Sequence, residues 1–358
     1  MVQVQGAMRL SLKNFKMKII GIGQTKFGEH YNRSLEDLMF EAIDLAITDA
    51  KIDVETLDLV IVANMLGGEI SAQSHLGSII CGKYGLNIPA YRVEAACASG
   101  GVAMNNAFNF MKTGKFRNVL VVGAEKMTDV FVNKTTELLM QATGESERNA
   151  GFSFPGLYAV MAQDYMSKYN LSRDELSIFP CLMHRNALQN EYAQFRNEIN
   201  INDVNDSQAV ALPLRIFDCS PVSDGACAVI LTDNLEYEGI TVIDSEMACD
   251  QPELTNRSSL TSINSAKIAA NKIYSRNKLS AKDIQILEIH DCFSIAGLIA
   301  LEDLGFATEG KSIELIKNIF ANSDSLILNP SGGLKACGHP VAATGIKQIV
   351  EITRIMRR

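Results

Sequence analysis

The sequence predicts an α/β protein built from two copies of one structural unit. Apolar runs of strand length alternate with stretches of helical periodicity along most of the chain. The segments "AKIDVETLDLVIVANM" and "NKLSAKDIQILEIHDC" each contain a helix end, a Lys and an aliphatic residue, a five-residue link and a strand. The segments "CASGG" and "HPVAA" each place a reactive side chain before small residues and a helix. These paired patterns indicate a duplication.

The first copy is predicted to begin with a strand at 17–23 and a helix at 34–50. Ser34 is the expected N-cap of that helix, because its hydroxyl can accept a hydrogen bond from a free backbone N–H of the first turn. The following elements are a strand at 57–63, a helix at 73–84, a short segment at 91–94, a helix at 101–113 and a strand at 118–123.

The pattern changes after the first copy, where helical stretches at 158–169 and 173–191 are joined by polar loops. We interpret this region as an inserted, mainly helical lobe, after which a strand at 224–233 returns to the first copy. The predicted division is an N-terminal half at 17–124 plus 210–235, the lobe at 125–209, and a C-terminal half at 236–358.

The C-terminal half is expected to hold strands at 239–248 and 283–293 and helices at 261–276 and 343–356. In the first copy the helix after the reactive residue leads into a strand. In the second copy the corresponding helix is followed by the last residue, Arg358. We therefore expect the last strand of the second copy to be missing.

The composition of the chain excludes several classes of function. The chain has 358 residues, 47% of them hydrophobic, and a net charge of −8, which supports a large core. No basic stripe points to nucleic acid, and no apolar run approaches the ~20 residues that span a bilayer. The first sixteen residues lack the apolar region of a signal peptide. Eight cysteines without a CxxC pair favour a reducing, cytoplasmic compartment over a disulfide framework.

Cys97 precedes two glycines and a predicted helix. A thiolate at a helix N-terminus is stabilised by free N–H groups and by the helix dipole, which lower its pKa. Gly100 and Gly101 would let a ligand approach closely. The segment alone leaves two interpretations open, a nucleophile and a small buried residue at a turn.

The stretch "NPSGGLKACGHPVAATG" at 329–345 combines a glycine-rich loop with His339 at a helix start. Pro340 follows at the first helical position, where proline is tolerated. A histidine held in this way can serve as a base for a cysteine, although a single histidine can also be structural. Cys337 could either react or pack in the core.

The stretch "EIHDCFS" at 288–294 places His290, Asp291 and Cys292 at the end of a predicted strand. The carboxyl edge of an α/β sheet is where ligands bind, which favours a functional interpretation. Zinc is the alternative for a His and Cys pair, but no CxxC or HxxxH partner is visible. "GIGQTKFG" is not a dinucleotide fingerprint, because Lys26 stands at the third glycine position. The chain also lacks a P-loop.

Together "ACASGG", "HDCF" and "GGLKACGHPVAATG" resemble the thiolase superfamily, in particular the branch of sterol-carrier-protein-2 thiolases and archaeal acetyl-CoA acetyltransferases. "SPVSDGACAVIL" and "NEYAQFRN" resemble the same branch, and the resemblance covers about 17–358. It implies two βαβαβαββ halves stacked as a five-layer α/β/α/β/α sandwich. It also implies that the inserted lobe helps to hold coenzyme A.

The resemblance further implies a role for each site residue. Cys97 would take the acyl group as a thioester, and His339 would activate Cys97 and help to bind the thioester oxygen. His290 would be the second donor to that oxygen, and Cys292 would be the acid and base that moves the α-proton. Ala342 replaces the usual glycine of the motif, so we expect a narrower site. A missing last strand would remove one backbone donor, so we expect weak or no activity unless another chain covers the gap.

The implied activity is that of a CoA-dependent acyltransferase, a thiolase that performs condensation or thiolysis. Its substrates would be CoA thioesters, with no separate cofactor and no metal. The alternative is a non-catalytic acyl-CoA-binding scaffold of the lipid-transfer type; a ketosynthase or an HMG-CoA synthase fits the motifs less well. The resemblance also implies a homodimer through the first-half sheet or a tetramer. It suggests an HMG-CoA synthase and a small zinc-ribbon/OB-fold acyl-CoA-binding protein as partners.

Overall fold

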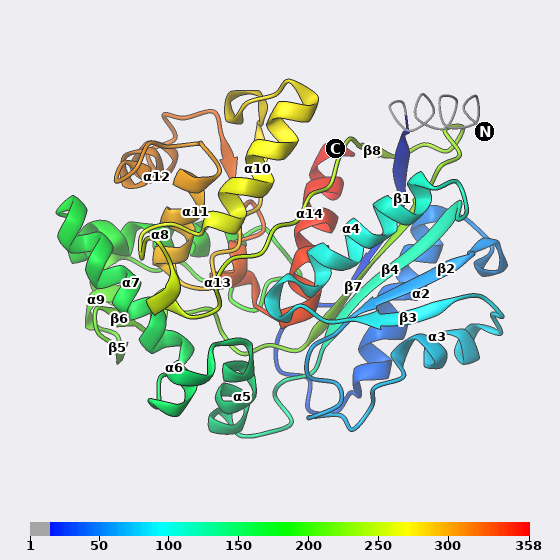
Figure 1. The fold of residues 1–358 in the computed structure, drawn as a ribbon, viewed down its shortest axis with the longest axis horizontal. Coiled ribbons are helices and arrows are strands. Elements are labelled where there is room, and N and C mark those ends of the chain that lie inside the picture. The colour runs from blue at the N-terminus through cyan, green and yellow to red at the C-terminus, as the bar shows by residue number, and fades with distance from the viewer. Residues whose placement is uncertain (1–14) are drawn as a thin grey trace.

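The computed structural model describes residues 15–358, so the N-terminal segment at 1–16 lies almost entirely outside the described residues. The fold is built on a six-stranded mixed sheet with the order β3-β2-β4-β7-β1-β8 (Figure 1). β2 pairs in parallel with β3 and β4, whereas β7 runs antiparallel to both β4 and β1. The strands are β1 (Met17–Gln24), β2 (Leu59–Ala63), β3 (Ala90–Val93), β4 (Asn118–Glu125), β7 (Gly225–Thr232) and β8 (Ile240–Val242).

Helices cover both faces of this sheet. Their bounds are α2 (Leu35–Ala50), α3 (Leu76–Tyr84), α4 (Ser99–Lys112) and α14 (Thr344–Met356). Val60 and Val62 of β2 pack in one core with α2 and α3, and the alternate residues Leu59 and Ile61 pack in another with α4 and α14. The helix predicted from Ser34 is confirmed, because the Ser34 hydroxyl accepts from an N–H of the first turn in a capping box.

The glycines of "GIGQTKFG" serve packing between β1 and α2. A Cβ on Gly21 would lie 2.3 Å from the Ala46 carbonyl oxygen, and one on Gly23 would lie 2.0 Å from the Ala42 carbonyl oxygen. Only glycine allows the strand to approach the helix backbone this closely.

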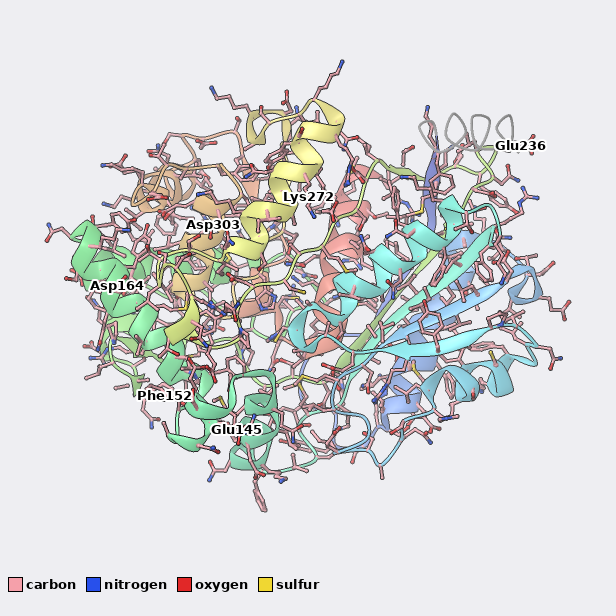
Figure 2. All side chains as sticks on the ribbon, in the orientation of Figure 1. Glu145, Phe152, Asp164, Glu236, Lys272 and Asp303 are labelled. Carbon is pink, nitrogen blue, oxygen red and sulfur yellow. The ribbon has the colours of Figure 1, made fainter. Side chains whose placement is uncertain are left out.

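The lobe between β4 and β7 is mainly helical, and Figure 2 labels Glu145, Phe152 and Asp164 on it. The helix expected at 158–169 is α7, which begins earlier because Ser153 caps its first turn. The helix expected at 173–191 is α8. The elements are α5 (Val132–Leu139), α6 (Glu145–Asn149), α7 (Phe154–Tyr169), α8 (Arg173–Ala187), α9 (Ile201–Asp206), β5 (Ala209–Ala211) and β6 (Leu214–Arg215).

The second copy differs from the prediction in its strands. The strand expected at 239–248 is only β8, which adds to the edge of the first sheet beside β1. The strand expected at 283–293 is only β9, which pairs in parallel with β10. The elements after β8 are α10 (Asn264–Asn277), β9 (Ile286–Leu287), α11 (Ser294–Asp303), α12 (Ser312–Phe320), β10 (Ile327–Leu328) and α13 (Gly333–Cys337).

Asn329 explains why the ladder of β9 and β10 stops. Its φ of +41° breaks the extended conformation, and Pro330 follows. The Asn329 side chain then accepts the Ile289 N–H at 2.7 Å, in place of a backbone carbonyl. The α/β class is confirmed, but within residues 15–358 the second sheet is a two-stranded ladder of four residues. Among the same residues, no helix combines the length and apolarity that crossing a membrane requires.

Candidate active site

Cys97 lies at a sharp turn between β3 and α4. The turn is the short helical segment Ala96–Ala98, and Ala96 has a left-handed φ of +49°. The Ser99 hydroxyl closes the turn, since its Oγ accepts the Ala95 N–H at 2.8 Å and donates to the Ala96 carbonyl at 2.6 Å. A local side chain therefore fixes the strained backbone that presents the Cys97 sulfur.

Gly100 makes room for a helix rather than for a ligand. A Cβ at this position would lie 2.8 Å from the Ala342 carbonyl oxygen and 3.0 Å from the Gly345 nitrogen, at the start of α14. The prediction that Gly100 opens the site to a ligand is therefore wrong, whereas Gly101 does face open space. Ala342 is fully buried and does not line the cavity described below, so the predicted narrowing of the site is also wrong.

His339 is held from both its backbone and its ring. Its N–H donates to the Ser223 hydroxyl at 3.0 Å, and its Nδ1 lies 2.7 Å from the Thr344 Oγ1. Because the Thr344 hydroxyl donates its proton to the Pro340 carbonyl at 3.1 Å, its oxygen accepts from Nδ1–H. We assign the proton of the neutral ring to Nδ1 on this basis, which leaves Nε2 with a free lone pair.

His290 and Cys292 lie in the segment that follows β9. The Ser220 N–H donates to the Cys292 carbonyl at 2.9 Å, and a β-bridge joins Cys219 to Phe293. These contacts fix the backbone of the segment, although the segment does not pair in a regular β-ladder. The Cys292 thiol is thereby fixed at the wall of the cavity.

The four predicted residues meet at one cavity of about 420 Å³. The reactive atoms of Cys97, His290 and His339 lie within 4.8 Å of one another, and the two imidazole rings are 5.1 Å apart at 82°. Cys292 lines the same cavity. The remaining wall is mostly apolar, and half of its residues come from the inserted lobe, for example Leu139. The arrangement brings two thiols and two imidazoles to one cavity. The trio within 4.8 Å could also hold Zn²⁺ by residue type alone.

Two other candidate side chains do not reach the cavity. Asp291 is fully buried, and its carboxylate accepts the Leu334 N–H at 2.7 Å. Cys337 is fully buried beside Asn190. Neither lines the cavity, so Cys337 packs in the core and Asp291 braces the segment behind the site.

The Cys97 thiol is protonated at rest. Burial, followed by the nearby Glu125 carboxylate, raises the pKa of Cys97 to about 12. The predicted lowering by the helix N-terminus is therefore wrong, because desolvation outweighs the dipole. Glu125 is itself fully buried, and burial raises its pKa to about 7 although the N–H groups of Met65 and Leu66 hydrogen-bond it. Cys97 consequently needs a base to become a nucleophile.

Both imidazoles are neutral near pH 7. Burial and the Lys347 cation lower the pKa of His290 to about 4. Burial, His290 and Lys347 together hold the pKa of His339 well below 6.5. A neutral His339 with Nε2 free can take the proton of Cys97, and its Nε2–H can then donate to a bound oxygen.

Sequence reasoning missed the side chains that hold these groups. Ser99 and Thr344 follow the reactive residues by two and five positions, so a search for hydroxyls at the two helix starts could have found them. Ser223 and Tyr158 are far away in the chain, and no local pattern points to either.

An α/β fold with this cysteine and histidine arrangement is that of thiolases. The chain belongs to the thiolase family, since residues 17–234 match "Thiolase, N-terminal domain" and residues 247–358 match "Thiolase C-terminal domain-like". The protein is therefore an acyltransferase of the thiolase type, as the motifs predicted.

Its relatives include two archaeal proteins. The acetyl-CoA acetyltransferase of Methanocaldococcus jannaschii is 44% identical, covering 93% of this chain and 88% of that protein. The acetyl-CoA acetyltransferase of Methanothermobacter thermautotrophicus is 41% identical, covering 95% and 90%. Human sterol carrier protein 2 is 30% identical, covering 93% of this chain and 64% of that protein.

Solved structures share the fold. The human mitochondrial 3-ketoacyl-CoA thiolase in complex with CoA has a TM-score of 0.75 and 18% identity, covering 96% of this chain and 92% of that one. The Ltp2-ChsH2(DUF35) aldolase has a TM-score of 0.80 and 21% identity, covering 94% and 90%.

Proposed function

We propose that the protein is an acetyl-CoA C-acetyltransferase, or a 3-ketoacyl-CoA thiolase in the reverse direction. Cys97 carries the acyl group, His339 is its base, His290 donates to the thioester oxygen, and Cys292 moves the α-proton. CoA thioesters are the substrates, with no other cofactor and no metal. The names of the two archaeal relatives support the reaction, and the geometry of the cavity supports the roles.

The first half-reaction transfers the acyl group to the protein. His339 Nε2 takes the proton of Cys97, and the thiolate attacks the thioester carbon of acetyl-CoA. A new C–S bond forms, the bond to CoA breaks, and Cys292 gives its proton to the departing CoA thiolate. His339 Nε2–H and His290 stabilise the oxyanion of the tetrahedral intermediate, in a cavity with a mostly apolar wall.

The second half-reaction forms the carbon–carbon bond. The Cys292 thiolate removes a proton from the methyl carbon of a second acetyl-CoA, which gives an enolate and restores the thiol. The enolate carbon attacks the acetyl group on Cys97, the C–S bond to Cys97 breaks, and Cys97 regains its proton from His339. Acetoacetyl-CoA leaves, and both thiols and His339 are back in their starting protonation states, because the α-proton on Cys292 replaces the one given to CoA.

The single observation that carries this proposal is the spacing within 4.8 Å of the reactive atoms of Cys97, His290 and His339. Thiolysis of acetoacetyl-CoA by CoA tests it. We expect turnover in the wild-type protein, which would contradict the weak or absent activity expected from a missing last strand. Cys97→Ala should lose at least about 10³-fold, since removal of a covalent nucleophile costs that much or more. Cys249→Ser is the matched control, because Cys249 is exposed and lies outside the cavity. Equal turnover in both variants would contradict the proposal.

A carrier without catalysis is the alternative, and the similarity to sterol carrier protein 2 is the observation that favours it. Iodoacetamide labelling separates the two functions. The enzyme predicts that Cys97 is alkylated and that acetyl-CoA protects it, whereas the carrier predicts intact CoA binding with no alkylation.

We also propose a cytoplasmic homodimer or tetramer in which β3, the edge strand of the first sheet, meets its copy. We further propose that the chain divides into an N-terminal half at 17–124 plus 210–235, a lobe at 125–209 and a C-terminal half at 236–358. A structural neighbour that is named as a complex with a DUF35 chain supports a second protein partner, such as the zinc-ribbon/OB-fold protein or an HMG-CoA synthase. Light scattering of the purified protein, with and without a co-expressed partner, measures the assembly.

A further inference from the structure

Tyr158 of α7 lines the active-site cavity beside Cys292. Its ring stacks on Phe293, the residue after Cys292, with 4.5 Å between the centroids and 27° between the planes. Tyr158 and Cys292 line the same cavity, and each of the two side chains shifts the pKa of the other. Since a β-bridge to Cys219 pins Phe293, the stack fixes the tyrosine ring relative to Cys292.

We infer that Tyr158 is the positioning residue of the α-proton transfer: its hydroxyl donates a hydrogen bond to the Cys292 sulfur and stabilises the thiolate form. The inference rests on the proposed function and deepens it, because it assigns the proton chemistry of Cys292 a partner in the inserted lobe. The lobe, which lies outside the duplicated halves, would then take part in the carbon–carbon bond step.

The chemistry of the site calls for such a donor. Cys292 must become a thiolate when it gives its proton to CoA and must return to a thiol when it removes the α-proton. Burial, followed by the proximity of Cys97, raises the pKa of the Cys292 thiol, and the Tyr158 hydroxyl opposes this rise. The pKa of Tyr158 is raised well above 10, chiefly by the charge of Cys292 and by burial, so the phenol keeps its proton and acts only as a donor.

Tyr158→Phe tests the inference, because it keeps the stacked ring and removes only the hydroxyl. One assay follows deuterium uptake from D₂O into the methyl group of acetyl-CoA, which reports on Cys292. The other follows acylation of Cys97 by an acetyl thiophenol thioester with mass spectrometry. Thiophenolate leaves without a proton, so the second assay does not depend on Cys292.

We expect deuterium uptake to fall by roughly tenfold or more and its pH profile to shift upward by about one unit, the size expected from losing one hydrogen bond to a charged group. Acylation of Cys97 should change less than about twofold. Alkylation of Cys292 by iodoacetamide in a Cys97→Ala background is a second measurement, and it should slow in the Tyr158→Phe variant.

Tyr165→Phe is the matched control. It removes a buried hydroxyl from the same helix, where Tyr165 contacts Glu302 and Ser312 away from the cavity. Deuterium uptake in this variant should stay at the wild-type rate. Unchanged uptake and an unchanged pH profile in Tyr158→Phe would overturn the inference, as would equal losses in both assays. Failure of the proposed function would instead show in the wild-type protein, which would neither acylate nor exchange.

Discussion

At the scale of residues, Thr344 decides which nitrogen of His339 carries the proton. A histidine base works only with a free lone pair toward its substrate, and the neutral ring offers one lone pair at either nitrogen. The Thr344 hydroxyl donates its hydrogen bond to the Pro340 carbonyl, so its oxygen accepts from the Nδ1–H of His339. The hydroxyl thus prepares Nε2 for Cys97 without touching any reacting atom.

Replacing Thr344 by Val should remove this preference while keeping the shape of the side chain. We expect kcat/KM for thiolysis to fall by about 10- to 100-fold, the range seen when a partner that orients a ligating histidine is lost. Thr344→Ser keeps the hydroxyl and should retain most of the activity. The two thiolysis rates check the prediction, and equal rates in the Val and Ser variants would refute it.

The pH dependence of activity should reflect the depressed pKa values of the imidazoles. An ordinary histidine near 6.5 would lose half of its basic form on acidification to that pH. The pKa of His290 is about 4 and that of His339 is well below 6.5, so both stay neutral at pH 6. The acid limb of kcat/KM should therefore lie well below pH 6 and fall as the pH approaches about 4. A midpoint at 6.5 would contradict the assigned environment of both rings.

At the scale of elements, α4 and α14 meet backbone to backbone at their N-termini. A Cβ on Gly100 would lie 2.8 Å from the Ala342 carbonyl oxygen, and one on Gly345 would lie 2.5 Å from the Gly101 nitrogen. α4 follows Cys97, and α14 follows His339. The close crossing therefore sets the separation of Cys97 and His339, the proposed nucleophile and base.

Gly100→Ala should force these helices apart. We expect a loss of about 1–3 kcal/mol in the free energy of unfolding, typical of overpacking in a closely packed interior, together with lower activity. Gly101→Ala is the control, because nothing lies within 4 Å of its added Cβ and alanine favours a helix. Urea unfolding of both variants provides the measurement, and equal midpoints would argue against the proposed role of Gly100.

At the scale of the whole molecule, a buried ion pair ties the segment of His290 and Cys292 to the helix that follows His339. Lys347 of α14 lies 3.1 Å from the Glu288 carboxylate, and both side chains are 0% exposed. Lys347 also donates to the Ser331 hydroxyl at 2.6 Å, which bonds the same carboxylate. The Lys347 cation thus ties together the segments that carry His290 and His339, and it adds to the burial that keeps both imidazoles neutral.

Lys347→Met should leave the Glu288 carboxylate buried without its cation. We expect a loss of about 3–5 kcal/mol in unfolding free energy, as for other broken buried pairs. The acid limb of the pH profile should also move upward, because Lys347 lowers the pKa of both histidines. Lys311→Met, in an exposed pair with Glu314, is the control and should leave both the unfolding midpoint and the profile unchanged. A wild-type profile in Lys347→Met would exclude the electrostatic part of this prediction.

The sequence predicted the elements and site residues that local patterns and motifs determine. Apolar runs, helical periodicity and the Ser34 cap located the strands and helices of the first copy, and three motifs located the four residues at the cavity. It failed where contacts from distant parts of the chain decide. The β9 strand stops because of Asn329, 40 residues after the Ile289 N–H that it accepts. The pKa of Cys97 rises because burial and Glu125 outweigh the helix dipole.

The contact of Gly100 with α14 also sets a limit for protein engineering. Moving Cys97 relative to His339 cannot make room for bulkier acyl groups, because the two helix backbones are already in close contact at that crossing. Directed evolution toward new substrates should therefore accumulate its productive substitutions in the inserted lobe, at wall positions such as Thr136 and Leu139.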